Sequence, residues 1–202
     1  MVSLMVLAWA GLAGCASSPS AQFYTLVPIA EVETRSDPLA GDRLSIGLGP
    51  LAWPLFLDRP QLVRRDGVRL RIDEFHRWGG SLNDDFLRVW GENLAYLLDN
   101  SRILVYPTEI RSPVDYRVLA EILTFEGRGD QEVVLKVRWV VTDPYLERAL
   151  VIRETSYRRP LTMTGEVDDE ARLVIGLSEV LGDFSRDVAA ALRRLPARSV
   201  PH

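Results

Sequence analysis

Residues 133–142 read VVLKVRWVVT, in which the odd positions are all apolar and Lys136 and Arg138 stand between them. Successive side chains of a strand point to opposite faces, so this alternation predicts a strand with one buried and one solvated face. Similar runs lie on either side, at Tyr116–Glu126 and Leu150–Tyr157. Glycines and an Asp-Pro pair mark short turns between the three runs. We therefore expect three consecutive strands that form an antiparallel meander.

Two helices are predicted around this meander. Ser81 is a good N-cap, two acidic residues follow it, and apolar residues then recur at helical spacing up to about Asp99. A longer helix is expected at roughly Asp168–Leu195, where the apolar residues form one stripe and Pro196 ends the pattern.

The N-terminal half contains shorter strand signals. Strands are predicted at Gln22–Val27, Leu44–Leu51 and Ile103–Tyr106, a hairpin turn at Asp66-Gly67, and a loop over residues 28–43. This order of elements contains no repeating β-α-β unit. It indicates an α+β fold, with a mostly antiparallel sheet and two main helices packed in a two-layer domain.

The composition excludes several function classes. The 202 residues are 47% hydrophobic and 26% charged, which is typical of a globular protein. The net charge of −4 argues against a dedicated nucleic-acid binder. Cys15 is the single cysteine, so no intramolecular disulfide and no multi-cysteine metal site can form. Neither a His-x-x-x-His pair nor the spacing of an EF-hand is present, and we expect no metal and no cofactor.

The N-terminus has the features of a lipoprotein signal peptide. Residues 1–14 are uncharged and largely apolar, and they are too few to span a membrane, which takes about 20. Small residues precede Cys15, and this arrangement resembles the lipobox of bacterial lipoproteins. The resemblance implies cleavage before Cys15, acylation of Cys15, a lipidated tether at 15–21 and a single periplasmic domain at 22–202. Ala16 rather than Asp follows the cysteine, which implies the periplasmic face of the outer membrane.

Two other interpretations of the N-terminus stay open. The run is also compatible with an ordinary secretory signal followed by a chance cysteine, or with a buried N-terminal helix. On the lipoprotein interpretation the tether is short, because the seven residues from Ala16 to Gln22 span at most about 25 Å. The folded body would then lie close to the membrane surface.

His76 is the one histidine that precedes the C-terminal residue. A hydrolase hypothesis would take His76 as the base, Asp73 or Glu74 as the group that orients it, and Ser81 as the nucleophile. No G-x-S-x-G motif supports it. The competing interpretation is a histidine that follows the hairpin and packs beside Trp78.

Arginines are dense between residues 59 and 77, at positions 59, 64, 65, 69, 71 and 77. A solvated strand face is the simpler interpretation. A docking surface for an acidic partner or for anionic lipid head groups is the alternative.

Several short motifs, taken in order, carry a family resemblance. They are Phe23-Tyr24-Thr25-Leu26, Gly49-Pro50, Leu57-Asp58-Arg59-Pro60-Gln61-Leu62-Val63, Phe75-His76-Arg77-Trp78, Trp90-Gly91-Glu92-Asn93-Leu94 and Asp115-Tyr116-Arg117-Val118. Together with the lipobox they resemble the PqiC-like ABC-type transport auxiliary lipoproteins, which are also called membrane-integrity-associated transporter subunits.

The resemblance implies a non-catalytic outer-membrane lipoprotein without a cofactor. Its partners would be an inner-membrane permease and a periplasmic protein with mammalian-cell-entry domains, in a system that moves lipid between the two membranes. A ring-shaped partner would suit a homo-oligomer. Cys15 is the one defined functional residue that carries over, as the lipidation site.

One motif is a candidate partner-docking surface. Its residues are Asp58, Arg59, Pro60, Gln61, Arg77 and Trp78. Asp58-Arg59-Pro60 would equally suit a rigid turn. Two other functions remain as alternatives, a periplasmic envelope hydrolase or remodelling lipoprotein that uses His76 and a stand-alone envelope lipoprotein.

Overall fold

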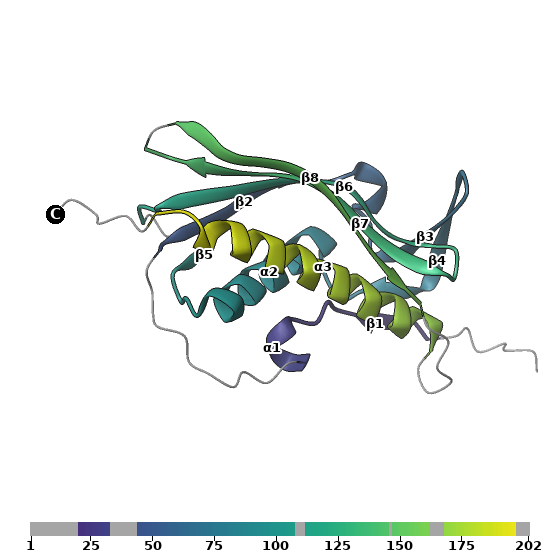
Figure 1. The fold of residues 1–202 in the computed structure, drawn as a ribbon. Helices are drawn as coiled ribbons and strands as arrows, with labels where there is room; N and C mark the ends of the chain where they lie inside the picture. The colour runs from purple at the N-terminus through teal and green to yellow at the C-terminus, as the bar shows by residue number, and fades with distance from the viewer. Residues whose placement is uncertain (1–19, 33–43, 108–111, 146, 162–167, 197–202) are drawn as a thin grey trace, which may run out of the picture.

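The computed structural model describes residues 20–32, 44–107, 112–145, 147–161 and 168–196. Within these ranges eight strands form one sheet, and the helices α2 (Leu82–Leu98) and α3 (Asp169–Arg193) lie together against one of its faces (Figure 1). The strands are β1 (Gln22–Tyr24), β2 (Ile46–Ala52), β3 (Gln61–Asp66), β4 (Arg69–Trp78), β5 (Ile103–Val105), β6 (Tyr116–Arg128), β7 (Glu132–Asp143) and β8 (Arg148–Pro160). Two short turns of helix, α1 (Ile29–Val32) and η1 (Leu55–Leu57), complete the described elements. None of the described helices combines the length and the apolar character that a membrane span requires.

The predicted meander is confirmed. β6, β7 and β8 pair antiparallel in sequence order. The alternation in β7 works as expected, because Val133, Leu135, Val137, Trp139 and Val141 have no exposed surface and face the helices. The hairpin of β3 and β4 is also antiparallel, with Asp66 opposite Arg69 across the turn.

The sheet as a whole is mixed, so the prediction of a mostly antiparallel sheet is wrong. Among the described residues four of the seven strand pairs are parallel: β1 with β4, β2 with β5, β2 with β6, and β3 with β6. The strand order is β1-β4-β3-β6-β2-β5, with β7 and β8 extending from β6. Parallel partners need long connections, and the connections from β2 to β5 and from β2 to β6 both contain the β3–β4 hairpin and α2.

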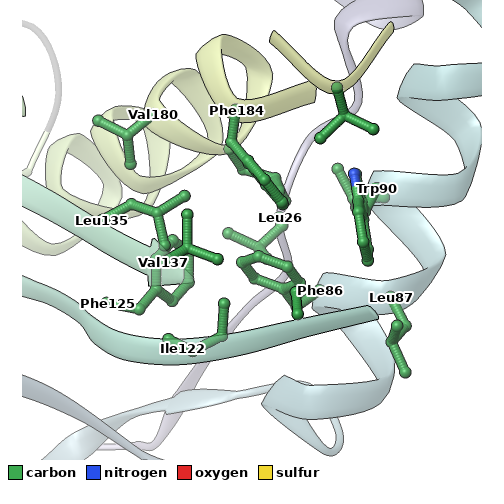
Figure 2. Packing of buried hydrophobic residues seen from close by; sticks show 14 of the residues in the cluster. Leu26, Phe86, Leu87, Trp90, Ile122, Phe125, Leu135, Val137, Val180 and Phe184 are labelled. Atoms are coloured by element: carbon green, nitrogen blue, oxygen red, sulfur yellow. The ribbon is translucent and has the colours of Figure 1, made fainter. Parts of the chain in front are cut away.

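The core lies between the sheet and the two helices. Phe86 and Trp90 of α2 and Phe184 of α3 meet side chains of β6 and β7 such as Phe125 and Val137 (Figure 2). Each helix begins at a capped residue, since Ser81 accepts a hydrogen bond from the Asp84 amide and Asp168 accepts one from the Ala171 amide. The expected positions of both helices are confirmed.

An N-terminal strap, residues 22–29, fastens the start of the described chain to both helices. Its first three residues pair with the end of β4. The amide of Leu26 then donates to Asp85 Oδ2 at 2.7 Å, that of Val27 to Ser178 Oγ at 3.0 Å and that of Ile29 to Asn93 Oδ1 at 2.7 Å. The strap therefore leaves the sheet after Tyr24, earlier than the strand predicted to Val27. α1 occupies the beginning of the predicted loop, and the remainder of that loop lies outside the described residues.

Candidate docking surface

Strand register brings two of the candidate docking side chains, Arg77 and Gln61, into one row with Phe23. Arg77 on β4 is paired with Gln61 on β3 and with Phe23 on β1. Residues paired directly across neighbouring strands point to the same face of a sheet. We call Phe23, Arg77 and Gln61 the docking row.

The motif at residues 58–60 forms a tight turn that leads into this row. The amide of Asp58 donates to the Leu55 carbonyl, and the Arg59 guanidinium donates from Nε to the Phe56 carbonyl at 2.8 Å. The amide of Trp78 donates to the Pro60 carbonyl at 2.6 Å and so joins the turn to the end of β4. Asp58 and Pro60 remain exposed. The rigid turn and an accessible surface therefore occur together.

Trp78 does not contribute its side chain to this surface. It is only 5% exposed and belongs to the hydrophobic core. The reason is its position, since it is the residue after Arg77 on the same strand and side chains alternate between faces. Asp58, Arg59, Pro60, Gln61 and Arg77 remain as accessible or partly accessible candidates.

Two apolar side chains beside these residues were not predicted as part of the surface. Phe23 is 66% exposed and ends the docking row, and Leu55, three residues before Asp58, is 86% exposed. Phenylalanine is among the residues enriched at protein interfaces, which makes Phe23 the stronger candidate of the two. The only sequence signal for Phe23 was its neighbour Tyr24, because two adjacent strand residues cannot both face the core.

The arginine-rich stretch contains both buried or partly buried arginines that make ion pairs and accessible arginines that make no ion pair with described residues. Arg64 is buried, and its guanidinium donates to the Asp169 carbonyl at 2.7 Å, at the start of α3. Arg65 pairs with the buried carboxylate of Glu126, with Nη2 3.1 Å from Oε2. These two arginines hold the hairpin to the rest of the fold, which leaves Arg59, Arg69 and Arg77 as the more accessible cations that make no ion pair with described residues.

His76 lies in a small polar cluster. Its Nδ1 is 2.9 Å from Asp73 Oδ1, which also accepts hydrogen bonds from the amides of Phe75 and His76. Burial raises the pKa of the Asp73 carboxyl, but the contact with the His76 ring and the two amides lower it by more, and the net pKa is below the usual value. The Asp73 carboxylate thus lies beside the His76 ring, where the hydrolase hypothesis places one of its acids, but His76 Nδ1 makes no well-aligned hydrogen bond with any described residue. Ser81, its proposed nucleophile, is the N-cap of α2.

The same cluster includes metal-ligating residue types. Atoms of Asp73, His76 and Glu170 lie within 4.8 Å of one another. Glu170 stands in the first turn of α3, where the helix dipole is positive, and its Oε1 is 3.5 Å from Arg64 Nη2. These positive charges already balance the carboxylate and oppose a second cation. We assign no metal to this cluster.

Cys15, the lipidation site expected from the lipobox, lies outside the described residues. The structure places the start of the strap at Gln22, seven positions after it. The lipidation of Cys15 stays a prediction.

Comparison with known proteins gives structural relatives and a family. A search of curated proteins finds no match. A crystal structure of an uncharacterized protein superposes with a TM-score of 0.67 at 16% identity, over 86% of this chain and 99% of that one. A protein from Xanthomonas campestris assigned to the family model DUF330 superposes with a TM-score of 0.58 at 14% identity, over 85% of this chain and 98% of that one. At such identities the likeness establishes a shared fold.

The family model extends over most of the chain. It matches residues 24–189, from Tyr24 at the end of β1 to the last turns of α3, and so includes Gln61 and Arg77 of the docking row and most of the core, whereas Phe23 lies just before it. The expected family resemblance is thereby confirmed, and the chain belongs to the family of ABC-type transport auxiliary lipoprotein components.

Proposed function

We propose that this chain is a lipid-anchored subunit on the periplasmic face of the outer membrane, where it docks the conduit of an ABC-type lipid transport system. The observation that carries the proposal is the family match over residues 24–189, which starts nine positions after Cys15 in the lipobox. The conduit would be a periplasmic protein with mammalian-cell-entry domains, connected to an inner-membrane permease. Docking there maintains envelope integrity, and a ring-shaped conduit would be matched by a homo-oligomer of this chain.

Replacement of Cys15 tests the lipid anchor. Cys15→Ala should release a folded protein into the soluble periplasmic fraction, abolish incorporation of labelled palmitate and impair the permeability barrier, because acyl chains supply the membrane affinity. Val68→Ala, at a hairpin position that is 96% exposed, is the matched control and should remain in the membrane fraction. A Cys15→Ala protein that stays fully membrane-bound would show that the anchor lies elsewhere.

The docking row supplies the proposed contact with the conduit. Phe23 offers an exposed aromatic side chain beside Arg77, and phenylalanine and arginine are both enriched at protein interfaces. Phe23→Ser and Arg77→Glu should each weaken recovery of the mammalian-cell-entry protein in a crosslinked pull-down by roughly tenfold. Ile152→Ser, a change at a 68% exposed position on β8, is the control and should leave recovery unchanged. Failure of the unaltered chain to recover such a protein would contradict the transport proposal.

A second function is favoured by one observation, the 2.9 Å contact between His76 and Asp73. A periplasmic hydrolase or envelope-remodelling lipoprotein would need His76 as a base. His76→Gln separates the two proposals. The docking subunit should retain partner recovery and barrier function with this change, whereas an enzyme would lose its activity.

A further inference from the structure

α2 and β5 pack against each other and together line a groove at the edge of the sheet farthest from β1. Figure 1 shows the two elements side by side. Its volume is about 520 Å³, within the range of ligand-binding pockets. One stripe of α2, with Leu87, Gly91 and Ala95, forms one wall, and Ile103 and Val105 of β5 form the other. We call this cavity the strand–helix groove.

The backbone of β5 is open on the side away from β2. The Ile46 amide donates to the Arg102 carbonyl, and the Tyr106 amide donates to the Leu48 carbonyl. In a parallel pair alternate residues of a strand bond to the neighbour, so the even-numbered residues face β2. The amides and carbonyls of Ile103 and Val105 therefore point to the outer edge, where no other described strand pairs with β5.

The groove and the open edge belong to the same residues. Ile103 and Val105 present their side chains to the cavity and their backbone groups to the edge beside it. An extended peptide that adds to β5 would find hydrogen-bond partners along its backbone and an apolar cavity for alternate side chains. A cavity alone would accept many apolar ligands, whereas this combination fits a strand.

The charge at the mouth of the groove favours a basic residue in that strand. Arg88 is already shared between Asp85 and Glu92, at 2.6 and 2.9 Å. Asp84 is exposed at the mouth and makes no ion pair with any residue that the structure describes. A lysine or arginine of an incoming peptide would meet this carboxylate.

We propose that the strand–helix groove binds an extended segment of a partner protein, which pairs with β5 as an added strand, places apolar side chains in the groove that β5 and α2 line, and carries a basic residue toward Asp84. This proposal concerns a surface on the opposite edge of the sheet from the docking row. It requires neither lipidation nor the transport partner.

The test uses the full chain and a set of synthetic peptides. In these peptides valine, isoleucine, leucine or phenylalanine alternates with threonine, and a lysine stands at either end. At least one peptide should bind, and amide hydrogen exchange at Ile103 and Val105 should slow by roughly tenfold or more in the complex. Exchange at Leu104, whose amide faces β2, should change little.

Three variants locate the binding. Val105→Pro removes an outward-facing donor, a change that edge strands tolerate, and should weaken binding roughly tenfold. Ala95→Phe should fill the cavity and weaken binding without altering the β5 backbone. Asp84→Asn should reduce affinity for the lysine-bearing peptides, whereas Asp169→Asn, the corresponding first-turn change in α3, should not. If Val105→Pro unfolds the chain, the Ala95→Phe variant tests the proposal, and unchanged peptide binding by that variant would contradict it.

Other occupants would overturn the proposal. If dodecanoate binds the unaltered chain but not the Ala95→Phe variant, and no peptide binds either, the groove is an acyl-chain site. Protection of Ile103 and Val105 that depends on protein concentration without any peptide would make the occupant a second copy of this chain. Peptide binding that leaves exchange at both amides unchanged would exclude strand addition.

Discussion

Asn93 joins three elements from a position with no exposed surface. Its Oδ1 accepts the Ile29 amide of the strap at 2.7 Å, and its Nδ2 donates to Ser185 Oγ of α3 at 3.2 Å. Ser185 in turn donates to the Leu181 carbonyl of its own helix at 2.7 Å. A buried polar side chain that is satisfied on both sides specifies how the strap and the helices meet, because alternative packings would leave its hydrogen-bonding groups unpaired.

Removal of this side chain should be costly. Asn93→Ala leaves the buried Ile29 amide without an acceptor and opens a cavity, so we expect a loss of about 2–3 kcal/mol in the free energy of unfolding. Asn83→Ala, on the same helix but only partly buried, should change it by less than about 0.5 kcal/mol. Urea unfolding of the two variants measures the difference, and equal stabilities would contradict the role of Asn93.

Tyr157 gives the fold a dependence on alkaline pH. Burial and the 2.7 Å hydrogen bond to Asp187 raise the pKa of its hydroxyl above the ordinary value of 10.0. A raised pKa means that the folded state resists deprotonation, so its contribution is complete below pH 10 and is lost as the pH rises above it. The sequence holds one lysine and five other tyrosines that also titrate in the alkaline range, so the variant at Tyr157 is needed to isolate its contribution.

Tyr157→Phe should therefore flatten the alkaline loss of stability. At neutral pH the variant should be less stable by about 1 kcal/mol, because it lacks the hydrogen bond to Asp187. Denaturant titrations at neutral pH and at several values above pH 10 give the comparison. A variant whose stability falls with pH as steeply as that of the parent chain would show that another group is responsible.

At the scale of elements, β2 contains a position, Gly49, where the backbone of a neighbouring segment lies too close for a side chain. Gly49 has a φ of +99°, and a Cβ there would lie 2.9 Å from the Tyr106 carbonyl oxygen. Gly49→Ala combines a disfavoured backbone conformation with a clash against the backbone that follows β5, so it should cost at least about 2 kcal/mol. Gly67→Ala is the control, because Gly67 also has a positive φ, of 57°, but nothing lies near its Cβ position. Thermal unfolding should show the larger loss for Gly49→Ala.

The positions of the helices and strands were largely predictable from the sequence, but the pairing of the strands was less so. Alternation revealed β7 because Lys136 and Arg138 interrupt its apolar residues at every second position. No such local signal reports that Ile46 pairs with both Ile103 and Tyr116. These contacts join segments separated by a hairpin and a helix, so the parallel pairs arise from packing of the whole chain.

The same distinction applies to the candidate surface. A motif brought Gln61 and Arg77 to attention, and register places them side by side. Trp78 was predicted to lie on the docking surface but is buried, and the sequence indicated no environment for Phe23, which is exposed. Both outcomes depend on which face of a strand is turned toward the helices. Hydrophobicity alone cannot tell a core tryptophan from an exposed phenylalanine.

For the whole molecule, the attachment of the N-terminal strap affects how the fold bears tension. Because the hydrogen bonds between β1 and β4 lie across the strands, a pull along β1 from its N-terminal end loads them together, in shear. The side-chain clasps at Leu26, Val27 and Ile29 share that load with both helices. Strands loaded in shear must break several bonds at once, whereas strands peeled apart break them one at a time. A body held in this way resists mechanical unfolding when it is tethered at one end and pulled by a moving partner at the other.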